Sequence, residues 1–173
     1  MPDTAKSRRC RGSAMVEFAL AGVASTVMMV GTVAVAYGMW NYHTLAYAIH
    51  ETTRYAAVHG KGCTNPGSSC SITVGNIANR IASMAIGVPA GSMKVTLTTD
   101  SGAETTCNPL TSCSSNGTVW PPATNSDNRL GKQITISASY VYSSPLLFFW
   151  PGVGAQQFGT IVFPASSKQT IIF

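Results

Sequence analysis

The chain has 173 residues, of which 45% are hydrophobic and only 10% are charged, and its formal net charge is +5. A typical soluble domain carries about 25% charged residues. Disordered chains are rich in charge and poor in apolar residues, and a nucleic-acid binder needs a basic stripe on its surface. The composition argues against both classes. The length suits one globular domain plus a smaller part, and the low charge points first to a membrane segment.

An uncharged stretch near the N-terminus predicts that membrane segment. Residues 18–50 contain no Asp, Glu, Lys or Arg, and residues 18–40 are the most apolar part. About 20 apolar residues cross a bilayer as a helix, and the aromatic residues Tyr37, Trp40 and Tyr42 stand where an interfacial belt is expected. A secretory signal peptide has a shorter apolar core, of about 7–15 residues. The sequence therefore predicts a retained anchor that spans residues 18–40.

The residues before the span predict its orientation. Residues 1–12 carry four basic residues against a single acid, Asp3: they are Lys6, Arg8, Arg9 and Arg11. Positively charged flanks stay on the cytoplasmic side. We therefore expect a single-pass protein with its N-terminus in the cytoplasm and its C-terminal part across the membrane.

Four of the five cysteines lie beyond the span, in two pairs: Cys63 with Cys70, and Cys107 with Cys113. The fifth, Cys10, lies in the basic flank. Each pair brackets a short polar stretch. In an oxidising compartment such pairs indicate two local disulfides, although four cysteines allow three connectivities. A zinc site is the competing interpretation, but the spacings C-x6-C and C-x5-C are wider than zinc ligands usually show.

Residues 8–20, RRCRGSAMVEFAL, combine a basic leader, Gly12, the small residue Ser13, and Glu17 at the head of the apolar run. This arrangement resembles the processing signal of type IV pilins and pseudopilins. In its details it is similar to the TadE-like group, minor pseudopilins of the tight-adherence (Flp) pilus system. Residues 48–60, AIHETTRYAAVHG, resemble the end of the same group's helix.

The resemblance implies a function, partners and a location. A prepilin peptidase would cut between Gly12 and Ser13 and remove the leader, residues 1–12. The mature protein would stay in the bacterial inner membrane with its C-terminal domain in the periplasm, or reach the cell surface with the pilus. Its partners would be other pilin or pseudopilin subunits, the inner-membrane Tad assembly machinery and membrane lipid. The implied role is in pilus biogenesis, adhesion or secretion.

The other interpretation of Gly12 is that it is an ordinary glycine beside a helix and not a cleavage position.

Glu17 is the predicted assembly residue. An acid at the edge of an apolar helix is costly unless it is neutral, hydrated or paired. Cleavage would free the α-amine of Ser13, which can pair with Glu17 of a neighbouring subunit and set the register between helices. The alternative is that Glu17 reaches the cytoplasmic interface by itself, six residues after Arg11.

The apolar run is predicted to be part of one long helix, residues 13–60. No proline occurs from 13 to 59, and the glycines at 60 and 62 supply a stop. Its second half carries Leu45, Ile49, Thr52 and Ala56 on one face, which is suited to pack on an outer domain.

Two further features of this helix suggest contacts. Ala34 and Gly38 have the spacing that lets membrane helices approach one another. Glu51 and Arg54 are spaced for a helical ion pair, worth only a few tenths of a kcal/mol.

The remaining residues, 61–173, are predicted to form a periplasmic α+β domain: a small antiparallel sheet packed on the long helix, with two local disulfides. The expected elements are a helix at 72–86 capped by Ser71 or Asn76, strands at 93–100 and 131–143, a long loop at 101–128, and one or two strands at 158–173 interrupted at Pro164. The apolar segment Pro145–Gly154 is either core or an exposed contact patch.

No catalytic, cofactor or metal site is predicted. His50-Glu51 begins like a zinc-protease motif, but Arg54 occupies the position of the second histidine. Three outer acids, Asp100, Glu104 and Asp127, lack the ordered spacing of a calcium loop. The main alternative to a pseudopilin is a single-pass anchored periplasmic binding module that never joins a filament. An anchored enzyme is the least favoured class.

Overall fold

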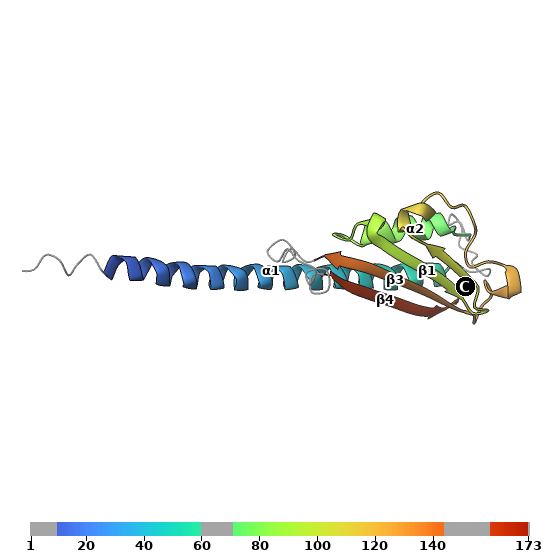
Figure 1. Cartoon of the computed structure of the whole chain (residues 1–173). Helices are drawn as coiled ribbons and strands as arrows, with labels where there is room; N and C mark the ends of the chain where they lie inside the picture. The colour runs from blue at the N-terminus through green and yellow to red at the C-terminus, as the bar shows by residue number, and fades with distance from the viewer. Residues whose placement is uncertain (1–9, 60–70, 144–159, 173) are drawn as a thin grey trace, which may run out of the picture.

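The computed structural model describes residues 10–59, 71–143 and 160–172, and the side chains of those from residue 14 onward except Thr160. Its longest element is helix α1 (Cys10–Ala57), a single helix of 48 residues. At about 1.5 Å per residue its length is roughly 70 Å. The first half of α1 extends from the rest of the molecule as a stalk, and the second half lies against the other elements (Figure 1).

Four strands form one antiparallel sheet in the order β2-β1-β3-β4. Their bounds are β1 (Met93–Thr99), β2 (Glu104–Cys107), β3 (Gln133–Ser143) and β4 (Thr160–Thr170). Alternate residues of β3 are buried, so one face of the sheet lies on the core and the other is open. The long helix with a small antiparallel sheet confirms the predicted α+β class.

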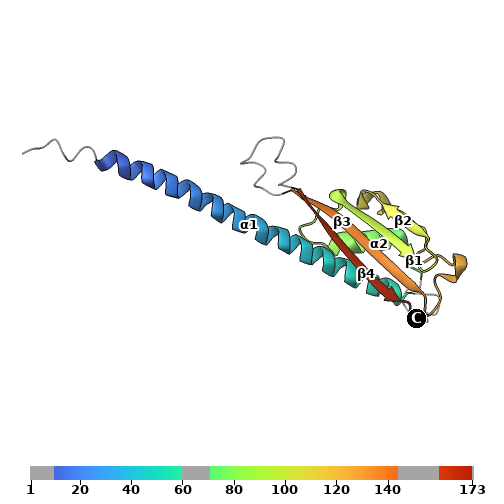
Figure 2. The ribbon, with the colours of Figure 1, turned by 60° about the horizontal axis from the view of Figure 1, so that its bottom comes forward.

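Strand β4 runs beside the second half of α1 (Figures 1 and 2). At one end, Phe163 lies against Gly38. At the other end, the backbone N–H of Ile172 donates to the carbonyl of Ala57, 3.2 Å away. Nine strand residues and nineteen helix residues both span roughly 30 Å, so strand and helix remain side by side over that length.

A second helix, α2 (Val74–Met84), joins α1 in covering the inner face of the sheet. The predicted cap was wrong: Thr73 is the N-cap, and its hydroxyl accepts from the backbone N–H of Asn76 at 3.2 Å. Threonine in extended backbone conformation is a favoured cap. A single hydrophobic core includes Leu45 and Ile49 of α1, Ile77 of α2, and Ile136 of β3.

The stretch expected to be a long loop is more ordered than predicted. It contains β2 and two short 3-10 helices, η2 (Leu110–Cys113) and η3 (Thr124–Ser126), and a third, η1 (Ala90–Ser92), precedes β1. Strand β2 has only four residues and a mostly exposed, polar sequence. Such a strand has little alternation to identify it.

Strand β4 is continuous through Pro164, so the predicted interruption was wrong. Pro164 pairs with Ser139 of β3. Because β4 is an edge strand, one of its sides needs no ladder hydrogen bonds, and a proline there costs little.

One disulfide, and not the two expected, is found in the described part of the chain. Cys107, the last residue of β2, is bonded to Cys113 in η2, with the Cα atoms 5.7 Å apart. The second expected disulfide is not confirmed, because Cys63 and Cys70 both lie outside the described residues. The bond between Cys63 and Cys70 therefore stays a prediction from their spacing alone.

The apolar segment Pro145–Gly154 also lies outside the described residues. Its two interpretations, as core or as a contact patch, stay predictions from the sequence.

Candidate functional site

The stalk half of α1 exposes apolar side chains in every direction. None of residues 14–33 is buried, and consecutive residues such as Val27, Met28 and Met29 are all exposed although each is turned about 100° from the last. A helix that is apolar on every side belongs in a membrane or inside a bundle of helices. The described helix from Ala14 onward is long and apolar enough to cross a membrane.

The hydroxyl groups of the stalk are satisfied within the helix. Thr26 donates to the carbonyl of Gly22 at 2.8 Å, Thr32 donates to that of Met28 at 2.9 Å, and Ser25 donates to that of Gly22 at 3.4 Å. Such bonds let Ser and Thr enter lipid without leaving a polar group unpaired. The stalk is therefore compatible with lipid along its length except at Glu17.

Glu17 is exposed near the start of this stalk. Its carboxylate has no hydrogen bond or ion pair with any other side chain from residue 14 onward that the structure describes. The acid thus needs a partner from residues before Ala14, from another chain, from water or from the lipid interface.

The predicted cleavage position lies inside α1. The helix begins at Cys10, three residues earlier than expected, so the backbone of Gly12 and Ser13 belongs to its first turns. Ser13 and Glu17 are four residues apart, about one turn of helix. Cleavage between Gly12 and Ser13 would therefore create an α-amine within one turn of the acid.

The sheet contacts α1 at Ala34 and Gly38 through aromatic side chains. Tyr142 of β3 donates its hydroxyl to the carbonyl of Ala34 at 3.0 Å, and its ring packs on Gly38, where a side chain would come within 3.3 Å of it. Phe163 of β4 stacks on Tyr142 with 5.5 Å between ring centroids. We call the contact of Tyr142 and Phe163 with Ala34 and Gly38 the aromatic clamp.

The clamp changes the interpretation of the small residues. The spacing of Ala34 and Gly38 suggests the approach of a neighbouring helix, but in this chain they receive Tyr142 and Phe163. Two features of the sequence are consistent with this contact. Tyr140 and Tyr142 are two residues apart and therefore lie on the same face of a strand. Gly38 has no side chain and so leaves room for an aromatic ring on the helix.

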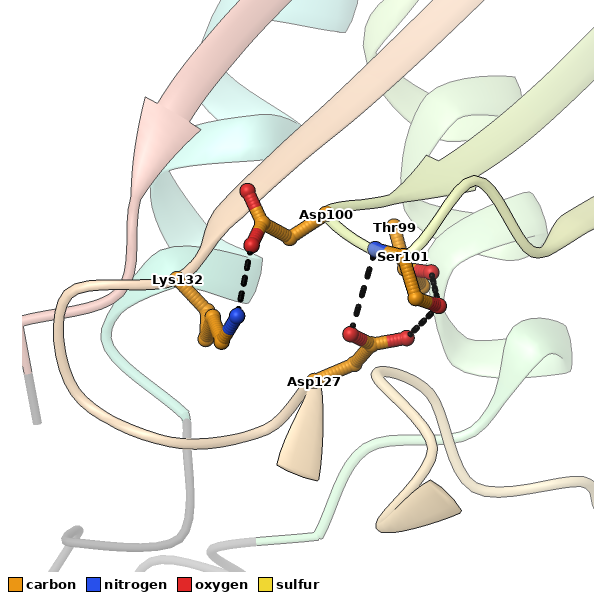
Figure 3. A network of polar contacts seen from close by, with 5 residues as sticks. All are labelled: Thr99, Asp100, Ser101, Asp127 and Lys132. Carbon is orange, nitrogen blue, oxygen red and sulfur yellow. Dashed lines mark hydrogen bonds and ion pairs between the residues drawn. The ribbon is translucent and has the colours of Figure 1, made fainter. Parts of the chain in front are cut away.

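The end of the sheet farthest from the stalk carries a polar network (Figure 3). Asp127 is buried and accepts hydrogen bonds from the backbone N–H of Ser101 at 3.3 Å and from the Ser101 hydroxyl. Lys132 forms an ion pair with Asp100 at 2.7 Å. The network braces the turn between β1 and β2, which reverses at Gly102 with φ +85°.

The network also sets the charge of its acids. Burial disfavours the ionised form of Asp127, but hydrogen bonds from Ser101 and Thr99 outweigh it and leave its pKa below the ordinary value. The hydrogen bond from Lys132 lowers the pKa of Asp100. Asp100 and Asp127 therefore act as bracing groups, while Glu104 lies exposed in β2. Within the described ranges no three potential metal ligands come together.

The expected ion pair between Glu51 and Arg54 is not formed. Among the described residues, Lys132 and Asp100 form the only ion pair. Arg54 is exposed, and an exposed helical pair contributes too little to hold two long side chains together. A different arginine makes the notable contact here: the guanidinium of Arg80 lies 4.2 Å from the ring centre of Tyr55 and ties α2 to α1.

Comparison with known proteins finds one family whose model matches part of α1. The family model described as TadE-like protein matches residues 12–54. Residues 12–54 are a TadE-like segment. The match begins at Gly12 and covers Glu17, the exposed stalk and most of the buried face. It confirms the resemblance identified from the sequence and associates the chain with the Tad pilus.

The TadE-like segment is about a quarter of the chain and leaves out α2 and the sheet. No curated protein and no solved structure matches the chain. The TadE-like family is a pilus-associated structural family. With the candidate membrane helix, the match supports a membrane-anchored pilus component.

Proposed function

We propose that this protein is a minor pilin or pseudopilin of a Flp/Tad-type pilus, a membrane-anchored structural or assembly subunit. The observation that carries the proposal is the stalk of α1. Twenty residues with no buried face lie in the TadE-like segment and include a single exposed acid, Glu17. An anchor and a filament both need such a surface, since lipid first and sister helices later would cover it.

In this function the leader directs insertion and a prepilin peptidase removes it after Gly12. The subunit then waits in the inner membrane with its disulfide-bonded domain in the periplasm, where an oxidising environment favours the Cys107–Cys113 bond. Assembly packs its stalk among other pilin or pseudopilin subunits. Pilus biogenesis, adhesion or secretion is the process served.

Glu17 has a specific role in that assembly. Within a bundle of stalks it pairs with the α-amine of Ser13 of the neighbouring subunit. A buried pair of this kind contributes more to register than to net stability. A subunit that merely anchors a binding module has no need for this pairing, so Glu17 distinguishes the two functions.

The experiment compares Glu17→Ala with Glu51→Ala in cells that assemble the pilus. Glu51 is an acid of the same helix that lies outside the stalk. Both variants should insert in the membrane, and intact mass should show loss of residues 1–12 in both. Glu17→Ala should be lost from the pilus-associated fraction by tenfold or more, which is about 1.4 kcal/mol of assembly free energy, and Glu51→Ala should assemble normally.

Three outcomes would contradict the proposal. Normal assembly of Glu17→Ala would contradict the pairing role of Glu17. Absence of the parent protein from the pilus-associated fraction would indicate a plain anchor. An intact mass that retains residues 1–12, in cells with an active prepilin peptidase, would rule out processing after Gly12.

A further inference from the structure

The outer face of the sheet is largely polar, with one apolar pair of residues near the stalk. Going along the β3–β4 pairs, Val141 faces Val162, then Ser139 faces Pro164, Ser137 faces Ser166, Thr135 faces Lys168, and Gln133 faces Thr170. Among these outward pairs only Val141 with Val162 is apolar on both strands, and the last pair toward the stalk, Ser143 with Thr160, is polar. We call residues 140–143 and 161–163 the stalk end of the sheet.

The stalk end is apolar on its other face as well. Ile161 lies opposite Tyr142, on the side that faces α1, and is nevertheless 51% exposed. Val141 and Val162 are 51% and 57% exposed on the outer side. Residues 133–143 of β3 and 160–167 of β4 contain no charged residue. Aliphatic side chains exposed on both faces of a strand end have no partner within the described part of the chain.

The aromatic clamp fixes the level of the stalk end along α1. Tyr142 bonds to Ala34 and Phe163 packs on Gly38, so this end lies beside residues 34–38. A bilayer core accommodates about 20 helical residues, and counting from Phe18, the first residue after Glu17, brings its far boundary to Tyr37. Tyr37 and Trp40 are exposed at that level, where interfacial aromatic residues are expected.

We propose that the stalk end of the sheet rests in the lipid leaflet from which α1 emerges, with Val141, Ile161 and Val162 inserted at the boundary between headgroups and acyl chains. Lipid is favoured over a second copy of the chain for two reasons. The patch lies at the level of Ala34 and Gly38, where the exposed surface of the membrane helix ends. Three aliphatic side chains are also far too few for a stable dimer, which buries about 1,200 Å² or more.

Seating of the strand end in lipid has a mechanical consequence. The helix and the sheet are joined by the clamp, so two contacts with the membrane, one through α1 and one through the strand end, fix the depth and the tilt of the outer domain. A subunit that leaves the membrane must release both contacts. The inference requires only that α1 spans a bilayer, and it does not depend on filament assembly.

The experiment measures the depth of spin labels in lipid vesicles. Single cysteines are introduced in a Cys10→Ser background as Val162→Cys at the stalk end, Thr170→Cys at the other end of the same strand and face, and Val27→Cys in the middle of the span, with the parent protein as the blank. Collision with lipid-soluble oxygen is compared with collision with a water-soluble nickel chelate. The ratio of oxygen to nickel collisions should be severalfold higher for position 162 than for position 170, and highest for position 27.

Each other outcome overturns the inference in a distinguishable way. Equal ratios at 162 and 170, with 27 protected from nickel, would exclude seating while leaving the anchor intact. Exposure of position 27 to nickel would exclude both the seating and the anchor. Spin–spin broadening at position 162 that persists when the protein is diluted in lipid would show that a second copy, and not lipid, covers the patch.

Discussion

The two halves of α1 have different compositions and opposite surroundings. Residues 14–33 bury nothing, whereas residues 34–57 bury Leu45, Ile49 and Ala56 and expose Tyr47 and Arg54 on the other side. Among the described residues, the first half of this unbroken helix has no partner in its own chain. The second half is covered by the sheet and α2. Apolar residues in the first half are available for lipid or other subunits, and those in the second half stabilise the fold.

This difference separates two kinds of defect. Changes in the second half should lower the free energy of unfolding of the outer domain. Changes in the stalk should leave that free energy unchanged and act on insertion or assembly. The aromatic clamp lies at the junction of the two halves. Variants of the clamp show whether residues at this boundary contribute to the free energy of unfolding.

The largest effect is expected from Ile49→Ala. Ile49 is fully buried against the sheet and α2, and such truncations cost about 3 kcal/mol. The matched variant Val27→Ala removes methyl groups from the exposed stalk and should change the stability of the domain by less than about 0.5 kcal/mol. Urea unfolding in detergent micelles, followed by fluorescence of the buried Trp120, measures both. An equal loss of unfolding free energy in the two variants would contradict the division of α1 into a stalk and a half that stabilises the fold.

The second test replaces a glycine in each half. A Cβ at Gly38 would lie 3.3 Å from the Tyr142 ring, whereas one at Gly31 would meet no atom within 4 Å. Gly38→Leu should push the ring out of the clamp and lower the unfolding free energy by about 2 kcal/mol. Gly31→Leu should leave it unchanged. If Gly38→Leu were as stable as the parent in the same micelle experiment, the clamp would not contribute to folding.

Local patterns in the sequence were sufficient for part of this fold. The uncharged run predicted the long helix, and the face formed by Leu45 and Ile49 predicted its buried side. The residue patterns at 93–100 and 131–143 predicted the two central strands, found at 93–99 and 133–143. The disulfide of Cys107 and Cys113 was also identified, because a short polar loop between two cysteines indicates a local bond.

Features that depend on contacts distant in sequence could not be predicted in this way. Pro164 suggested a break, because its tolerance depends on β4 being an edge strand. Ala34 and Gly38 suggested another helix, because nothing nearby in the sequence indicates that Tyr142, more than a hundred residues later, fills the site. The bracing role of Asp127 likewise depends on Ser101, twenty-six residues away.

A smaller effect is expected from the hydrogen bond of the clamp. Tyr142→Phe removes the hydroxyl that donates to Ala34 and should lower the unfolding free energy by about 1 kcal/mol. Tyr140→Phe is the matched control, since Tyr140 is buried on the same face and its hydroxyl makes no hydrogen bond within the described residues. Equal stability of the two variants would assign the clamp's contribution to ring packing alone.

The smallest effect at neutral pH is expected at the polar end of the sheet. Hydrogen bonds hold the pKa of Asp127 below its ordinary value despite burial. A depressed folded-state pKa adds stability above the unfolded value, about 3.9, and that stability is lost as pH falls through the folded value. The parent should therefore lose stability below about pH 4, and Asp127→Asn should show a flatter pH dependence there.

The matched control is Asp100→Asn, because Asp100 also has a lowered pKa but its ion pair with Lys132 is partly exposed. Exposed pairs contribute little, so this variant should keep most of the parent's acid sensitivity. The deficit of Tyr142→Phe should stay constant over the same pH range, since the clamp has no carboxylate among its residues. A clamp deficit that varied below pH 4 would show that the two ends of the sheet are coupled.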